Sequence, residues 1–413
     1  MNQLNRFSQK NSQNKMNIGI VTTWFERGAS QVSRQYRDLL NKKNNVFIYA
    51  RGGEKYERNN PIWDTEDVTW GKKAYFQTNG TPIKRSHFKN WIEKNKIDVL
   101  FFNEQQWWIP VIWAKEWGIK IGSYIDYYTK DTVPFFEIFD FLICNTKRHY
   151  SAFEWHKNCH YVKWGTDTSL FSPNENFSKK NEKIVFFNSA GHNPDRKGVR
   201  ELIEAFHSIN NDFAELLIHT QVDLLKFYPD LKEKIIKLKN QKKLKIIQKT
   251  VSAPGLYHMG DVYCYISKLD GIGLTVPEAL SCGLPVITPD HPPMNEFVKE
   301  NINGKLVDVV DTYFREDGYF WPQLKIDNNS LITALEYYIS QKNNILQLKI
   351  ASREYAKANL NWKDRLNEIN DIFHNVKRDN SKKIINDIRL YERKNLLKNF
   401  HQLPRTMVKT LLR

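Results

Sequence analysis

The sequence predicts an α/β protein with two Rossmann-like, doubly wound domains that face each other across a cleft. Short apolar segments, typical of buried parallel strands, alternate with segments of helical period along most of the chain. This alternation stops at a polar stretch over residues 172–183 and then starts again. A chain of 413 residues is also too long for one ordinary core and suits two domains with extensions.

The first domain is expected over residues 16–175, after a polar leader at residues 1–15. Gly28 is expected to form the turn between the first strand and the first helix, because glycine adopts backbone conformations that other residues avoid. Helices are expected over residues 30–43, 86–96 and 110–118. Strands are expected over residues 16–24, 45–50, 97–102, 119–125 and 139–144.

The second domain is expected over residues 176–360, followed by C-terminal helices with a basic tail over residues 361–413. Its strands are expected to begin near residues 183, 214, 244, 261 and 284, with helices over 199–209 and 276–283. Open parallel sheets bind ligands at the carboxyl ends of their strands, where the strand order reverses. We therefore expect the functional residues in the loops after these strands, facing the first domain.

The composition excludes a chain that is disordered as a whole. Hydrophobic residues make up 41% of the sequence and aromatic residues 13%, which is enough to bury a core. The formal net charge is +16, and residues 377–413 hold eleven Lys and Arg against three acidic residues. The rest of the chain is only mildly basic. We therefore expect a phosphate-bearing ligand or an anionic membrane surface as the partner, and no nucleic acid.

The cysteines and the apolar runs exclude several other classes of protein. The four cysteines are scattered and form no C-x-x-C pair, so neither a zinc site nor a disulfide framework is expected. The most apolar run, residues 135–144, is interrupted by Glu137 and Asp140 and is too short to cross a bilayer. The leader lacks the apolar core of a signal peptide. A cytoplasmic protein is expected.

A loop rich in cations follows the first strand of the second domain. The strand is expected to end at Asn188. The loop before the next helix carries four candidate site residues, Gly191, His192, Arg196 and Lys197. Helix N-termini attract anions through free N–H groups and the macrodipole, so this loop is a candidate diphosphate site. Solvated loop charges are the alternative interpretation of Arg196 and Lys197.

Residues 265–290, YISKLDGIGLTVPEALSCGLPVITPD, form a second candidate segment. Asp270 precedes a loop in which Gly271 and Gly273 allow backbone N–H groups to approach a ligand closely. Glu278 begins the next helix, where it is expected to accept hydrogen bonds from a vicinal diol such as a ribose. The alternative is a carboxylate that only stabilises the helix dipole, by about 0.3–1 kcal/mol.

These segments resemble the hallmark of the retaining GT-B glycosyltransferases, and of glycosyltransferase family 4 in particular. That family carries two glutamates eight positions apart around a Gly-aromatic-Gly turn, followed by a Cys-Gly-x-Pro-Val-Ile run. The matching positions here are Ser267, Asp270, Gly271, Gly273, Leu274, Glu278, Ala279, Cys282, Gly283, Pro285, Val286 and Ile287, followed by Glu296, Asn303 and Gly304. The interdomain motif of the family appears as Gly165, Asp167, Phe171 and Pro173. Lys197 and Gly198, with LIEAF, match its phosphate-binding lysine and helix.

Three positions depart from the family pattern and leave donor preference and activity open. Asp270 stands in place of the first glutamate and is one methylene shorter. His192 stands where an arginine is usual, and Arg196 is expected to supply the missing charge. Gly28 followed by Ala29 stands in place of an N-terminal glycine pair.

The resemblance implies transfer of a sugar from a UDP- or GDP-linked donor, with retention of anomeric configuration and without a metal. Lys197 would stabilise the leaving diphosphate, with Arg196 and His192 beside it. Asp270 would contact the sugar hydroxyls, and Glu278 the ribose. The backbone amides of four loop residues would hold the phosphate or the sugar: Gly271, Ile272, Gly273 and Leu274.

On the first-domain side, the family places a residue that faces the reacting sugar after a central strand. Asp126 is the nearest polar candidate, with a turn or helix-cap role as the alternative. The aromatic segment at residues 105–108 is expected either to line the acceptor site or to pack in the core. The basic tail, with apolar residues at helical spacing, would lie either on an anionic membrane or as a solvated helix across the domains.

The leading interpretation is a glycosyltransferase that acts on a glycan or lipid-linked acceptor in the synthesis of a bacterial surface polysaccharide, lipopolysaccharide or glycolipid. A GT-B phosphorylase or a sugar-nucleotide epimerase is the second interpretation. A non-catalytic partner that binds a nucleotide sugar is the third, and a nucleic-acid-binding protein the fourth.

Overall fold

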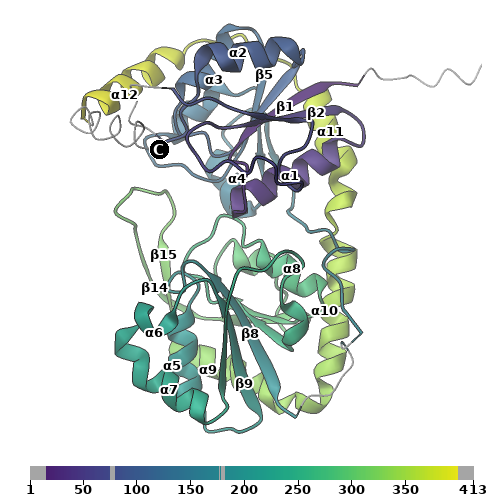
Figure 1. Cartoon of the computed structure of the whole chain (residues 1–413), viewed down its shortest axis with the longest axis vertical. Coiled ribbons are helices and arrows are strands. Elements are labelled where there is room, and N and C mark those ends of the chain that lie inside the picture. The colour runs from purple at the N-terminus through teal and green to yellow at the C-terminus, as the bar shows by residue number, and fades with distance from the viewer. Residues whose placement is uncertain (1–14, 75–79, 176, 178–181, 399–413) are drawn as a thin grey trace, which may run out of the picture.

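The computed structural model describes residues 15–74, 80–175, 177 and 182–398, and it contains two parallel β-sheets that carry helices on their faces (Figure 1). The sheet of the N-terminal domain lies in the upper lobe of Figure 1 and that of the C-terminal domain in the lower lobe. The predicted fold class, two Rossmann-like α/β domains, is confirmed.

The N-terminal sheet has seven strands in the order β3-β2-β1-β4-β5-β6-β7. Its central strands are runs of buried residues, as their unbroken apolar sequence predicts. The strands are β1 (Asn17–Thr22), β2 (Asn45–Ala50), β3 (Val68–Trp70), β4 (Val99–Phe102), β5 (Lys120–Tyr124), β6 (Phe141–Cys144) and β7 (Cys159–Tyr161). The helices between them are α1 (Gly28–Leu40), α2 (Arg85–Lys94), α3 (Ile109–Glu116), the 3₁₀ helix η1 (Val133–Ile138) and α4 (Lys147–Phe153).

The C-terminal sheet has six strands in the order β10-β9-β8-β11-β12-β13. The strands are β8 (Ile184–Gly191), β9 (Ala214–Thr220), β10 (Leu244–Gln248), β11 (Val262–Cys264), β12 (Val286–Pro289) and β13 (Gly304–Val307). The helices are α5 (Val199–Ser208), α6 (Leu224–Phe227), α7 (Lys232–Asn240), α8 (Thr275–Ser281), α9 (Asn328–Ser340) and α10 (Ile345–Asn359). The strand order reverses between β1 and β4 in the first sheet and between β8 and β11 in the second. These are the places where such sheets bind ligands.

Two expected element bounds are wrong. Strand β8 continues to Gly191, three residues past the expected end at Asn188, because Ser189 and Gly191 still pair with β9. The polar Asn188 is tolerated inside this strand because its Nδ2 donates a hydrogen bond to the carbonyl of Cys264 at 2.8 Å. Gly28 is the first residue of α1 and does not form the turn before it.

The last part of the chain returns to the N-terminal domain. Helix α10 packs on α8, and α11 (Leu366–Asn375) then packs against α1. Helix α12 (Ile385–Lys398) lies on α3 and η1 at the left of the upper lobe in Figure 1. None of the described helices is long and apolar enough to span a membrane. Residues 399–413 of the basic tail lie outside the described residues.

An antiparallel hairpin, β14 (Val309–Tyr313) and β15 (Gln323–Ile326), extends from the lower lobe toward the upper one (Figure 1). Its tip pairs with the segment that follows β5. Tyr319 forms an antiparallel bridge with Thr129, and Phe320 N donates to the carbonyl of Tyr128 at 3.0 Å. Trp321 Nε1 donates to the Tyr128 hydroxyl at 2.5 Å. The hairpin therefore connects the two domains on one side of the cleft.

Gly165 lies where the chain passes between the domains for the first time, beside the segment of its return. Thr166 N donates to Leu360 O at 2.7 Å, and Trp362 N donates to Thr166 O at 3.0 Å. A Cβ at Gly165 would lie 2.5 Å from Leu360 O and 3.0 Å from Trp362 N. Glycine is needed here because two backbone segments approach each other closely.

We expect Gly165→Ala to lower the free energy of unfolding by about 1–3 kcal/mol, because the added methyl group forces the two crossing segments apart. Thermal and urea denaturation would measure the loss. Gly28→Ala is the matched control, since the nearest atom to a Cβ at Gly28 is Leu274 Cδ1 at 3.9 Å. Equal stability of the two variants would contradict this account of Gly165.

Candidate functional site

Two cavities lie between the domains, at the strand ends where the strand order reverses. We call them the Glu278 cavity and the Asp270 cavity. The Glu278 cavity, about 370 Å³, is lined by residues that include Ser189, Tyr257, Glu278 and, from α1, Gln31 and Arg34. The Asp270 cavity, about 460 Å³, is lined by residues that include Gly28, Glu104, Asp126, Arg196, Asp270 and Gly271. Both cavities therefore use residues from both domains.

Lys197 ends the β8–α5 loop, directly before Gly198. Position 198 requires glycine for two reasons: its φ is +70°, and a Cβ there would collide with the carbonyl of Ile266. The close approach brings Lys197 Nζ within 2.5 Å of Asp270 Oδ2 and 2.6 Å of the Tyr265 hydroxyl. Lys197 and Asp270, predicted from separate motifs, thus meet at one place.

Arg196 strengthens the positive charge around Asp270. Its Nη1 donates to Leu269 O at 2.8 Å and lies 3.2 Å from Asp270 Oδ2. Burial alone would raise the pKa of Asp270, but Lys197 and Arg196 outweigh burial and hold this pKa well below its usual range. Burial lowers the pKa of Lys197 to about 8, against the opposing effect of Asp270. At neutral pH the site therefore holds two cations around one carboxylate.

Glu278 lies in the first turn of α8 and faces the other cavity. The Tyr257 hydroxyl donates to Glu278 Oε2 at 2.7 Å. Burial raises the pKa of Glu278 to about 7 even though this hydrogen bond favours the ionised form. Nearby Glu26 adds to the rise. Glu278 is thus a partly buried carboxyl group with one oxygen hydrogen-bonded to Tyr257.

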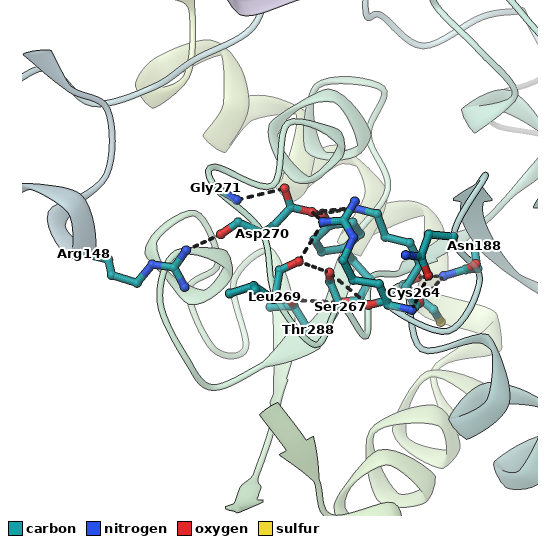
Figure 2. Close-up of polar contacts among 12 residues, drawn as sticks. Arg148, Asn188, Cys264, Ser267, Leu269, Asp270, Gly271 and Thr288 are labelled. Carbon is teal, nitrogen blue, oxygen red and sulfur yellow. Dashed lines mark hydrogen bonds and ion pairs between the residues drawn. The ribbon is translucent and has the colours of Figure 1, made fainter. Parts of the chain in front are cut away.

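The loop over residues 271–274 is held by α4 of the N-terminal domain. Figure 2 shows Arg148 reaching the main-chain carbonyl of Asp270 from the side opposite Asn188 and Cys264. His149 Nε2 lies 3.0 Å from Gly271 O, and burial lowers the pKa of His149 to about 3, so it is neutral. The neutral ring donates to this carbonyl. The N-terminal domain therefore fixes the loop of the C-terminal domain.

Asp126 approaches the same loop from the end of β5. A Cβ at Gly271 would collide with Asp126 Oδ1, so the carboxyl group lies directly against this glycine. Glu104 follows the adjacent strand β4 and lines the same cavity, 3.4 Å from Arg27. Burial and the neighbouring Glu104 raise the pKa of Asp126 well above its usual range. The raised pKa favours the protonated form of Asp126, which can both donate and accept hydrogen bonds.

The structure does not bring every candidate residue to the lining of the cavities. Lys197 lines neither of them, although it contacts Asp270, which does. Gly28, Ile272 and Leu274 line the Asp270 cavity, although the Ile272 side chain is also part of the core. Gly273 has a φ of +82°, a backbone conformation that favours glycine. Gly191 and His192, expected to bind the donor, lie at and beyond the end of β8. Because β8 continues to Gly191, His192 is exposed beyond the strand end, and neither residue lines these two cavities.

The residues of the aromatic segment 105–108 have two different roles. Trp108 is buried and packs edge-to-face on Phe136 with ring centroids 5.0 Å apart. Trp107 packs in the same way on Trp113 at 5.5 Å. Gln106 lines the Asp270 cavity. Core packing is therefore the correct interpretation for the two tryptophans.

Several site residues were not identified from the sequence. Tyr257 and Tyr265 hold Glu278 and Lys197, and the alternation of VYCYI at residues 262–266 could have placed Tyr263 and Tyr265 on one strand face. Tyr319 and Arg315 reach the Asp270 cavity from the hairpin, for which we find no motif in the sequence. In the part of the chain that the structure describes, no group of three or more His, Cys, Asp or Glu is arranged to hold a metal ion.

Comparison with known proteins shows that the chain is similar to glycosyltransferases. Residues 171–312 match the family model described as Glycosyl transferases group 1. The chain has the GT-B glycosyltransferase fold. The match begins at the interdomain motif and ends in β14, so it covers the two motifs that carry Lys197 and Glu278. No curated protein matches the sequence significantly.

Solved GT-B structures cover nearly the whole chain. A glycosyltransferase from Rickettsia africae is 17% identical, with a TM-score of 0.70 over 88% of this chain and 100% of its own. HepE (Alr3699) from Anabaena, solved in complex with UDP, is 13% identical, with a TM-score of 0.69 over 87% and 100%. WaaG, a glycosyltransferase involved in lipopolysaccharide biosynthesis, is 15% identical, with a TM-score of 0.62 over 87% and 100%. At these identities the likeness establishes the GT-B fold.

We expect Glu278→Gln to stabilise the protein at pH 8 by on the order of 2 kcal/mol and to have little effect at pH 4.5 or below. The folded protein binds this proton with a pKa of about 7, against an ordinary value of 4.5. Wild-type stability is therefore lost as the pH rises from about 4.5 to about 7, and the uncharged amide avoids that loss. Urea denaturation at both pH values measures it, with Glu336→Gln on an exposed position of α9 as the control. A gain that is independent of pH would contradict the assigned pKa.

Proposed function

We propose that the protein is a retaining glycosyltransferase, resembling family 4, that transfers a sugar from a nucleoside diphosphate sugar to a glycan or lipid-linked acceptor. The observation that carries the proposal is the contact of Lys197 and Arg196 with Asp270 beside a strand-end cavity, which Arg196 and Asp270 line and which lies next to the one that holds Glu278. Cations beside a helix N-terminus suit a diphosphate, and a carboxyl group one cavity away suits a ribose.

In this proposal the donor spans both cavities. The nucleoside occupies the Glu278 cavity, with the ribose hydroxyls on Glu278. The diphosphate lies beside Lys197, Arg196 and the first N–H groups of α5. The sugar occupies the Asp270 cavity, where the Asp126 carboxyl group faces its hydroxyls. HepE, solved with UDP, with UDP and glucose, and with UDP-glucose, supports a UDP-linked donor. A GDP-linked donor is the second choice.

The proposed residues act on the charge that develops as the donor breaks. The bond between the anomeric carbon and the diphosphate oxygen breaks, and its electron pair leaves with the diphosphate. Lys197 and Arg196 stabilise that negative charge. With retention, the acceptor oxygen enters from the face that the diphosphate leaves, so the diphosphate is the nearest base for the acceptor proton. No metal takes part in this scheme, and turnover should persist in EDTA.

We expect Lys197→Ala to lower the turnover number at least about a hundredfold, because the leaving diphosphate loses a cation that no water molecule replaces. The assay is mass spectrometry of products after incubation with a panel of UDP- and GDP-sugars and a bacterial lipid extract. Arg200→Ala is the control, because Arg200 lies in the first turn of α5, three residues after Lys197, and pairs with Asp230 instead of Asp270. A near-wild-type rate would remove Lys197 from the mechanism.

The same assay separates the proposed reaction from its alternatives. An epimerase consumes the donor without an acceptor, and a phosphorylase requires phosphate. A non-catalytic partner binds the nucleotide sugar and forms no product. Transfer that depends on a glycan or lipid acceptor supports the glycosyltransferase, and the lipopolysaccharide role of WaaG supports a bacterial surface glycan or glycolipid as the product.

We further propose that the C-terminal helix contacts an anionic membrane near a lipid-linked acceptor. One face of α12 packs on the N-terminal domain through Ile385, Ile388 and Tyr391. Leu390 and Leu397 are 52% and 64% exposed, seven residues apart and among cations. An exposed apolar pair flanked by Lys and Arg suits the interface of an anionic bilayer.

We expect Leu390→Glu with Leu397→Glu to weaken binding to vesicles of phosphatidylglycerol and phosphatidylcholine roughly tenfold, through lost apolar contact and added negative charge. Sedimentation with the vesicles measures binding. Ile236→Glu on α7, 42% exposed in wild type, is the matched control. Unchanged binding of the double variant would exclude α12 as the contact.

A further inference from the structure

Three tyrosines form a buried column beneath the two cavities. Tyr263 and Tyr265 belong to β11 and the residue after it, and Tyr257 begins the 3₁₀ helix before this strand. The ring centroids of Tyr257 and Tyr263 are 5.6 Å apart, and those of Tyr263 and Tyr265 are 5.9 Å apart. Their exposed fractions are 5%, 0% and 1% in chain order. The column connects the cavity of Glu278 with that of Asp270.

The hydroxyl groups at the two ends of the column touch the residues proposed to bind the donor. The Tyr257 hydroxyl donates to Glu278. The Tyr265 hydroxyl contacts both Lys197 Nζ and Asp270 Oδ2, which also contact each other. A charged ammonium only donates and an ionised carboxylate only accepts, so the roles are fixed. Tyr265 accepts a hydrogen bond from Lys197 and donates one to Asp270.

Tyr265 restrains Lys197 in two ways. Its hydroxyl accepts from Nζ at 2.6 Å, and its ring centroid lies 4.5 Å from the same atom. Among the described residues, Tyr265 and Asp270 take two of the three N–H bonds of the ammonium, which leaves one for a phosphate oxygen. A lysine side chain otherwise samples many rotamers, so two fixed partners reduce the entropy lost when an anion binds.

We propose that Tyr265 is a positioning residue of the donor site, whose hydroxyl holds Lys197 and Asp270 in the arrangement that receives the diphosphate. Tyr257 has the corresponding role for Glu278 at the ribose. The inference rests on the proposed function, since it assigns the two ends of the column to two parts of the donor. Asp270 is a short side chain, and the Tyr265 hydroxyl supplies the contact that keeps its carboxylate on Lys197.

The test separates the diphosphate from the nucleoside by titrating UDP and uridine, and GDP and guanosine, into the full-length protein. Tyr265→Phe keeps the ring and removes the hydroxyl. It should weaken binding of UDP and GDP about tenfold, because a hydrogen bond to a charged group is lost beside the proposed diphosphate position. It should leave the affinity for uridine and guanosine within about twofold, because the contact at the proposed ribose position is kept. Tyr257→Phe should weaken both the nucleoside and the nucleotide. Tyr263→Phe, in the middle of the column, is the control and should change neither.

The outcomes distinguish this inference from the proposed function. If the wild-type protein binds neither UDP nor GDP, the proposed donor site fails, and the inference fails with it. If the wild type binds and Tyr265→Phe retains its diphosphate affinity, the positioning role is wrong and the donor site stands. Equal losses for nucleoside and diphosphate, together with a lower melting temperature, would overturn the positioning role in favour of a purely structural one.

Discussion

The close approach of Gly198 to the carbonyl of Ile266 determines the geometry on which the donor site depends. It places the β8–α5 loop against the end of β11, and Lys268 N then donates to Arg196 O at 2.8 Å. The β8–α5 loop and the loop after β11 therefore form one continuous surface. A side chain at position 198 would separate them, and Lys197 would no longer reach Asp270. The electrostatics of the site therefore follow from a steric constraint on one backbone atom.

The second constraint is that the N-terminal domain holds part of the C-terminal site. Arg148 and His149 of α4 bind the carbonyls of Asp270 and Gly271, and Asp126 lies against the same glycine. The hairpin makes a further contact at Tyr128, whose hydroxyl lies 2.8 Å from His149 Nδ1. The loop that faces the sugar position is thus fixed by both domains. Separation of the domains would release it, which couples domain closure to the form of the site.

Sequence reasoning predicted the architecture and the motif residues because both depend on local patterns. Unbroken apolar runs predicted the parallel strands, and glycine positions predicted the two loops that carry Lys197 and Asp270. Short edge strands such as β3 and β7 have too few residues to show a period. The end of β8 was misplaced because it depends on pairing with β9, which no local signal records.

The roles of Tyr265, Glu104 and the hairpin were not predictable for a different reason. Each depends on contacts between residues far apart in sequence, such as Tyr265 with Lys197 and Tyr319 with Thr129. A tyrosine in a buried strand is interpreted as a core residue until the position of its hydroxyl is known. The family motif predicts which residues surround the donor, but it does not indicate what holds them.

Three carboxyl groups around the cavities differ in protonation because their surroundings differ. Asp270, beside Lys197 and Arg196, has a pKa held well below the usual range and accepts hydrogen bonds only. Burial raises the pKa of Glu278 to about 7, and burial with Glu104 raises the pKa of Asp126 well above its usual range. An incoming diphosphate would add negative charge beside all three. A carboxyl group that keeps its proton repels this charge less than an ionised one, so the raised pKa values of Glu278 and Asp126 favour an anion beside Lys197 and Arg196. The burial that makes these two groups costly to ionise therefore lowers the cost of bringing an anion into an acid-rich cavity.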